Sequence, residues 1–139
     1  MKKTLQLALI LFLFSLASAY AQTYKFMTTG FSVMEKNSQG EWGKWSDLQE
    51  TKLIISLDTN KNRIIVYSQE VQWYDIVSYE KEEVTEDNIV NPFSCKDEDG
   101  YAVTLSIITR KNQGNRKQLY ITRNNYVLVY NIENYTEKK

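Results

Sequence analysis

Apolar residues recur at every second position in short runs along this chain, and turn-forming residues separate the runs. In the clearest run, over residues 101–109, Tyr101, Val103, Leu105 and Ile107 fall on one face. A β-strand places successive side chains on opposite faces, so this pattern is typical of a strand with one buried face. No stretch keeps the i, i+3, i+4, i+7 spacing of an amphipathic helix for long enough to predict one. The chain is therefore predicted to be all-β.

The same alternation predicts about eight strands within the 139 residues. We expect them over residues 24–35, 52–57, 63–68, 71–79, 84–95, 101–109, 117–122 and 126–132. The loops at 58–62 and 123–125 are rich in the Asp and Asn residues of hairpin turns, and Asn can take the positive φ of a tight primed turn. Gly30, in the middle of the first strand, predicts a bulge or a sharp bend.

Consecutive hairpins with short loops favour a single antiparallel up-and-down barrel of about eight strands, because closure removes the exposed sheet edges. A β-sandwich is the alternative. An eight-stranded barrel is wide enough either to be filled by its own side chains or to hold one ligand, and both possibilities stay open here. Residues 22–139 are expected to form this one domain.

The first 21 residues have the layout of a secretory signal peptide. Lys2 and Lys3 precede an apolar run over residues 5–16, and small residues with Ala19 and Ala21 provide the cleavage site. The apolar run is too short for a membrane span. We therefore expect a periplasmic or secreted protein without a membrane span.

Residue types that are missing restrict the chemistry. The chain has no histidine and only one cysteine, Cys95, which excludes Ser-His-Asp sites, the usual zinc sites and an intramolecular disulfide. A carboxylate pair that includes Asp75 is the one catalytic arrangement left open. Basic and acidic residues balance at 17 each, so bulk charge does not attract nucleic acid. The sequence predicts no enzyme activity, no metal and no cofactor.

The aromatic side chains indicate a ligand-binding pocket, because pockets for small ligands are lined by aromatic rings with a few polar groups. We expect Trp73 and Tyr101 to form the wall of a ligand site at the barrel mouth, with Trp42 and Trp45 in a lid over residues 36–50. The protein is then a binding protein for a small hydrophobic or aromatic ligand.

An alternative function uses charge in place of a cavity. Arg110, Lys111, Arg116 and Lys117 lie on both sides of one predicted hairpin tip. Such a tip can present four cations to an extracellular protein or an acidic polymer, on a barrel whose interior is solid. The protein is in that case an interaction or inhibitor module.

The segment Gly43-Lys44-Trp45 resembles the Gly-x-Trp signature of lipocalins. With the strand pattern of residues 22–139, the chain is similar to small exported lipocalin-like, or calycin-like, proteins of unknown function from Bacteroidota. The resemblance implies a β-barrel and a binding role, and it implies no catalytic residue.

Overall fold

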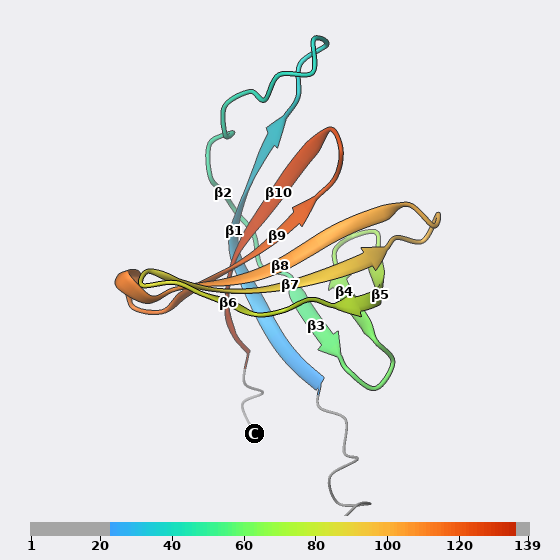
Figure 1. The fold of residues 1–139 in the computed structure, drawn as a ribbon, viewed down its shortest axis with the longest axis vertical. Helices are drawn as coiled ribbons and strands as arrows, with labels where there is room; N and C mark the ends of the chain where they lie inside the picture. The colour runs from blue at the N-terminus through green and yellow to red at the C-terminus, as the bar shows by residue number, and fades with distance from the viewer. Residues whose placement is uncertain (1–22, 136–139) are drawn as a thin grey trace, which may run out of the picture.

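The computed structural model describes residues 23–135 and shows a closed antiparallel β-barrel of eight strands with two short strands outside it (Figure 1). Closure comes from hydrogen bonding between the first and last strands of the chain. The up-and-down barrel predicted from the sequence is confirmed, and the alternative sandwich is not formed. The predicted signal peptide over residues 1–21 lies outside the described residues.

Barrel strands that follow one another in the sequence pair with each other in the barrel, and the outer strands β2 and β6 do not interrupt this order. The eight barrel strands are β1 (Thr23–Glu35), β3 (Ile54–Asp58), β4 (Arg63–Tyr67), β5 (Gln72–Tyr79), β7 (Asn88–Lys96), β8 (Ala102–Arg110), β9 (Arg116–Thr122) and β10 (Tyr126–Asn134). The outer strands are β2 (Gln49–Glu50), beside β1, and β6 (Glu83–Val84), beside β7. A short 3-10 helix, η1 (Lys111–Gln113), lies at the tip between β8 and β9.

Alternate side chains on every barrel strand point inward and pack together. Five side chains from β4, β8 and β9 are at most 1% exposed: Ile64, Val66, Leu105, Leu119 and Ile121. Each buried aliphatic side chain of this size stabilises the fold by about 1.5–3 kcal/mol. The interior is thus a hydrophobic core built from residues that are distant in sequence.

The predicted bulge in the first strand is present. Thr28 pairs with Ile132 and Gly30 pairs with Asn131, so Thr29 is an extra residue on β1. A Cβ on Gly30 would lie 3.1 Å from the carbonyl oxygen of Gln49 and from Leu48 Cδ1. Glycine is therefore needed here because the chain that leads into β2 passes close to the backbone of β1.

The two Asn- and Asp-rich loops form hairpins, but only the first of them contains an Asn residue with positive φ. Asn62, at the end of the β3–β4 loop, has a φ of 52°. Asn124 and Asn125 join β9 to β10 without positive φ, so the primed turn predicted there is wrong. The second non-glycine residue with positive φ in the described chain is Asn115, at the β8–β9 tip.

We predict that the core side chains dominate stability. Leu105→Ala should lower the free energy of unfolding by about 2–5 kcal/mol, because it removes buried methyl groups and leaves a cavity. Val77→Ala, at an outward-facing position that is 64% exposed, should change it by less than about 0.5 kcal/mol. Urea unfolding followed by fluorescence measures both, and equal losses would contradict the register described here.

Cys95 should be unreactive in the folded protein. It is 3% exposed and packed in the core, and burial raises the pKa of its thiol to about 12. The reactive species is the thiolate, so a thiol reagent at neutral pH should label Cys95 only after denaturation. Fast labelling of the native protein would show that this part of the core opens.

Candidate functional site

One end of the barrel is formed by the turns at 68–71, 97–101 and 123–125, and we call it the mouth. Inward-facing positions at the ends of two strands, β9 and β7, meet there. Arg123 continues the inward row of Leu119 and Ile121, and Asp97 continues the inward row of Phe93 and Cys95. The strand period of two therefore directs one cation and one carboxylate toward the same opening.

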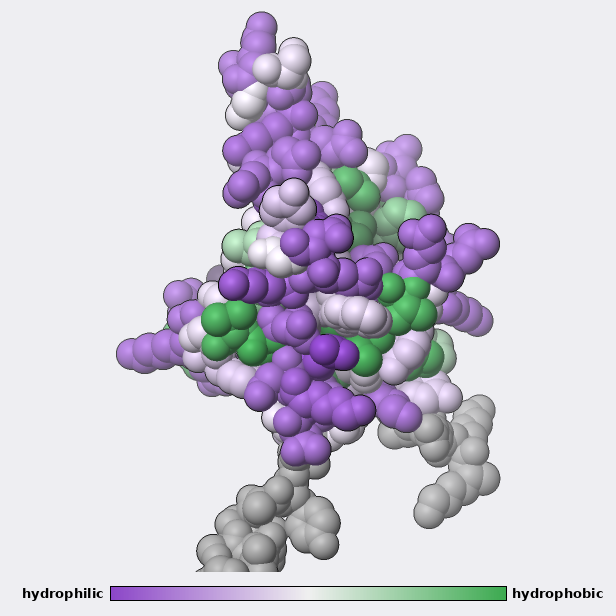
Figure 2. Space-filling view, turned by 90° about the vertical axis from the view of Figure 1, so that its right-hand side faces the viewer, coloured by the Kyte–Doolittle hydropathy of each residue, from purple (hydrophilic) through white to green (hydrophobic). Residues whose placement is uncertain are grey.

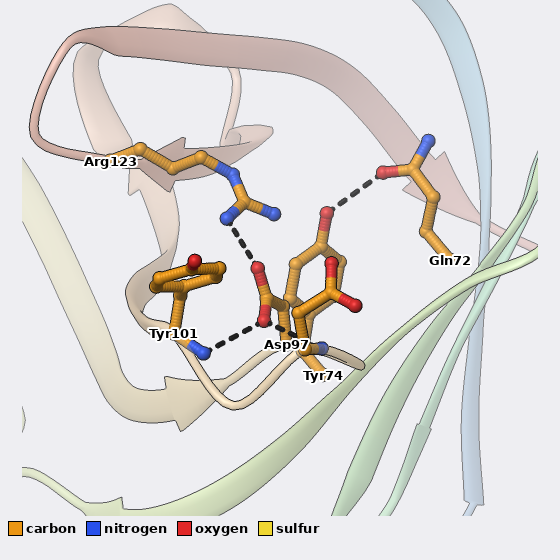
Figure 3. Close-up of polar contacts among 6 residues, drawn as sticks. Gln72, Tyr74, Asp97, Tyr101 and Arg123 are labelled. Atoms are coloured by element: carbon orange, nitrogen blue, oxygen red, sulfur yellow. Dashed lines mark hydrogen bonds and ion pairs between the residues drawn. The ribbon is translucent and has the colours of Figure 1, made fainter.

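Arg123 and Asp97 form an ion pair across the mouth (Figure 3). The guanidinium Nη1 lies 2.6 Å from Asp97 Oδ2, and the side chains are 22% and 11% exposed. The guanidinium also lies over two aromatic rings, 5.9 Å from the ring centre of Tyr74 and 5.8 Å from that of Tyr126. These cation–π contacts and the charge-assisted hydrogen bond fix Arg123 at the end of the core.

A tight turn holds Asp97 in place for this contact. The other carboxylate oxygen, Oδ1, accepts hydrogen bonds from the backbone N–H groups of Asp99 at 3.0 Å and Tyr101 at 2.9 Å (Figure 3). Gly100 completes the turn with a φ of 86°, in the left-handed region. The hydrogen bond from Arg123, assisted by the two backbone donors, holds the pKa of Asp97 below its usual value.

For Tyr74 and Arg123, burial and the neighbouring polar groups shift the pKa in opposite directions. Burial raises the pKa of Tyr74, and the neighbouring Arg123 guanidinium opposes this shift only in part. The Tyr74 hydroxyl donates a hydrogen bond of 2.8 Å to Gln72 Oε1 (Figure 3). Burial alone would lower the pKa of Arg123, but the hydrogen bond to Asp97 and the neighbouring Tyr126 and Tyr74 together outweigh it, and the net shift is upward. Arg123 is thus a permanent cation, with its Nε buried and without a hydrogen-bond partner.

A cavity of about 240 Å³ opens beside the ion pair. Its lining combines two aromatic residues, four acidic residues and one arginine: Glu70, Val71, Gln72, Trp73, Tyr74, Asp97, Glu98, Asp99 and Arg123. Four carboxylates against one guanidinium make the lining strongly negative. Such a cavity can hold a small molecule that places a ring against the aromatic side chains and a positive charge or N–H groups toward the carboxylates.

Two of the predicted site residues lie at this mouth. Trp73 lines the cavity, but from the outer face of β5, where Arg63 lies 5.1 Å from its ring centre. Tyr101 is 69% exposed and contributes its backbone N–H to Asp97. The phenol of Tyr101 therefore does not pack in the core, and it is the main chain of Tyr101 that holds Asp97 in place.

Trp42 and Trp45 lie elsewhere, because the connection from residue 36 to residue 48 folds back along the outside of the barrel. Ser46 and Ser32 bind each other there, with 2.6 Å between Ser32 Oγ and the carbonyl oxygen of Ser46. The Trp45 ring contacts Tyr120 edge-on, with 6.3 Å between ring centres. Trp42 carries the Lys36 ammonium 4.9 Å above its ring. The structure does not bring these two rings to Trp73.

This connection forms a small second layer on the barrel. Val129 points outward, opposite Ser32 on one side and Tyr120 on the other, and yet it is only 7% exposed. The contacts of Ser46 and Trp45 with those two neighbours place the connection over Val129. Gly43-Lys44-Trp45 therefore belongs to a segment that packs on the outside of the barrel.

Asp75 lies outside the barrel, on the half-exposed outer face of β5. Its carboxylate binds Arg63 Nε at 2.8 Å, and its cross-strand neighbour on β7 is Lys96. The carboxylate that the sequence left open for catalysis thus lies in an ion pair on the outer face of the barrel. The acidic residues that follow β5, from Glu80 to Glu86, are exposed.

Sequence reasoning missed Arg123 and Asp97 as site residues, because both were assigned to turns. The available signal was the two-residue period of a β-strand. Counting by twos from Leu119 places Arg123 on the core face, and counting from Phe93 places Asp97 there. Opposite charges at the inward ends of β9 and β7, at the same end of the barrel and with one strand between them, are placed where an ion pair can form.

Comparison of the chain with protein-family models, with curated proteins and with solved structures found no match. Between residues 23 and 135, no helix is long and apolar enough to cross a membrane. Within the same residues, no group of three or more His, Cys, Asp or Glu side chains is arranged to hold a metal ion.

The ion pair at the mouth should make stability depend on pH. Because the pKa of Asp97 is lower in the folded chain than in the unfolded chain, its contribution is complete above the ordinary carboxyl pKa and is lost as the pH falls through the lowered value. Arg123→Gln should reduce stability at neutral pH, and the difference from the wild type should shrink as the pH falls below the ordinary carboxyl pKa.

Arg63→Gln is the matched control, because it removes a guanidinium from an ion pair whose side chains are 35% and 50% exposed. An exposed pair of this kind contributes at most about 1 kcal/mol. Thermal unfolding at several pH values measures both variants. A loss in Arg123→Gln that is independent of pH would show that packing, and not the ion pair, is responsible.

Proposed function

We propose that this protein is an exported, non-enzymatic binding protein that holds one small ligand in the mouth cavity. The observation that carries the proposal is the cavity of about 240 Å³ walled by Trp73 and Tyr74 at the end of the barrel. The central core residues Ile64, Leu105 and Ile121 are nearly fully buried and do not line this cavity. The ligand therefore lies at the rim and not along the barrel axis.

The charge of the lining narrows the ligand chemistry. Asp97 is neutralised by Arg123, whereas Glu70, Glu98 and Asp99 line the same cavity and are exposed. Carboxylates close to aromatic faces attract organic cations, because ring quadrupole and carboxylate act with the same sign. We therefore propose a small aromatic or aliphatic cation, in place of the small hydrophobic or aromatic ligand expected from the sequence.

Export and lipocalin-like ancestry belong to the same proposal. Both rest on the sequence, on the signal-like residues 1–21 and on Gly43-Lys44-Trp45. The barrel architecture is compatible with this ancestry, although a fold by itself does not determine a function. A periplasmic or secreted location would bring the mouth into contact with small molecules from outside the cell.

Three probes that share one ring but differ in charge test the ligand class. Trp42→Phe/Trp45→Phe leaves Trp73 as the only tryptophan, since the chain has three. We expect phenyltrimethylammonium to change Trp73 fluorescence at about tenfold lower concentration than benzyl alcohol, and benzoate to bind most weakly. No response to any probe, or a preference for benzoate, would contradict the proposal.

Charge removal at the cavity supplies the control. Glu98→Gln/Asp99→Asn should abolish the preference for the cation and leave the weak affinity for benzyl alcohol unchanged. Glu82→Gln/Glu83→Gln removes the same charge at exposed positions outside the cavity lining and should change nothing. If both double variants lose the preference equally, the effect comes from net charge and the mouth is not the site.

A further inference from the structure

A second polar cluster lies on the outer face of β7, β8, β9 and β10, away from the mouth. Arg110 is half-buried there, and each end of its guanidinium binds a neutral side chain. Its Nη1 donates to Asn88 Oδ1 at 3.0 Å, its Nε to Gln118 Oε1 at 3.1 Å, and its Nη2 to the Tyr120 hydroxyl at 3.1 Å. We call Asn88, Arg110, Arg116, Gln118, Tyr120 and Asn131 the arginine face.

A second guanidinium belongs to the same network. Arg116 stands directly opposite Arg110 in the β8–β9 register. Its Nη1 donates to Asn131 Oδ1 at 3.0 Å, and its Nε and Nη2 both donate to Gln113 Oε1. Gln118, only 8% exposed, links the two halves, because its amide nitrogen also donates to Asn131 Oδ1 at 3.0 Å.

Neither of these two cations has a counter-ion among residues 23–135. Like charges directly opposite each other destabilise an antiparallel pair. Within the described residues, the ion pairs are those of Arg63 with Asp75 and Arg123 with Asp97, so no carboxylate lies within ion-pair distance of Arg110 or Arg116. Each guanidinium uses three of its five N–H groups on neutral oxygens and keeps two for another acceptor.

The surroundings add a cavity and an aromatic surface. A cavity of about 420 Å³ lies beside Arg116 and is lined also by Lys117, Asn131 and the tip residues Gly114 and Asn115, with Glu133 as its one acidic residue. On the other side, the ring of Tyr120 meets Trp45, which is 43% exposed. Guanidinium groups with free donors beside an exposed indole suit a ligand that carries both oxyanions and flat apolar faces.

We propose that the arginine face binds an acidic polysaccharide. Sulfate or carboxylate groups of the polymer accept the free N–H groups of Arg110 and Arg116, and a sugar ring lies against Trp45. The polymer, and not a free anion, is indicated by the continuous path of contacts from Arg116 through Asn131, Gln118, Arg110 and Tyr120 to Trp45. The exposed carboxylates of the β6 turn, including Glu86 and Asp87, border this face and limit how the polymer can approach.

Binding to a heparin column and titration with heparin fragments at low salt test the proposal on the full mature chain. We expect retention that weakens as salt rises, although the whole sequence carries a formal net charge of zero. Arg110→Gln/Arg116→Gln should weaken binding about tenfold or more. Lys61→Gln/Lys96→Gln removes the same charge from exposed positions outside the arginine face and should leave binding unchanged. Equal loss in both double variants, or no retention of the wild type, would overturn the proposal.

Two further variants separate a polymer from a free ion and from misfolding. Trp45→Ala should weaken heparin binding and leave the effect of inorganic sulfate on thermal stability unchanged. The proposal fails if inorganic sulfate binds with the same affinity as heparin has per sulfate group and if Trp45→Ala does not weaken heparin binding. The face would then be only an ion site. Arg116→Gln alone changes an exposed residue, so it tests the site even if the loss of Arg110 disturbs folding. None of these residues lines the mouth cavity, so either proposal can fail without the other.

Discussion

The pairing of β1 with β10 is the contact on which the rest of the structure depends. It joins residues about one hundred positions apart and converts a meander with two open edges into a barrel without edges. The bulge at Thr29 is part of this closure, because it changes which β1 side chains point inward halfway along the strand. Before the bulge, Phe26 and Thr28 point inward; after it, Phe31 does, in contact with Tyr130. Gly30 then allows the chain near Leu48 to approach the outer surface.

Closure also determines where a ligand can bind. The inward positions are occupied by aliphatic and aromatic side chains along the barrel and by the Arg123–Asp97 pair at the mouth, so the axis is filled. The paired charges are held by hydrogen bonds and aromatic rings, which offsets much of the cost of removing them from water. What remains for binding is the rim and the outer wall. The two proposals use these two surfaces, and they carry opposite charge: carboxylates line the mouth cavity, whereas unpaired guanidinium groups form the arginine face.

The aromatic residues show how the barrel distributes rings between its inside and its outside. Tyr74 and Tyr130 are buried in the core, whereas Tyr67 and Trp73 are exposed on the outer wall. Trp73 and Tyr74 are adjacent in sequence, so the period of a strand requires them to face opposite ways. Trp45 reaches the outer wall for another reason, because its connection turns back along β1 through hydrogen bonds between Ser46 and Val33. A strand pattern contains no information about such a return path.

Local pattern alone determined the approximate limits of most barrel strands and the bulge at Gly30, because each of these depends on residues close together in the chain, but it predicted one strand over residues 84–95 where the structure has β6 and β7. The exclusion of histidine chemistry came from composition. The inward face of β8 followed in the same way from Val103 and Leu105. Only the tertiary structure decided that Arg123 meets Asp97, that Arg110 stands opposite Arg116, and that Trp45 packs against Tyr120 on the outer wall. Those contacts depend on strand register and on the path of a long connection, both of which are set by packing between residues that are distant in sequence.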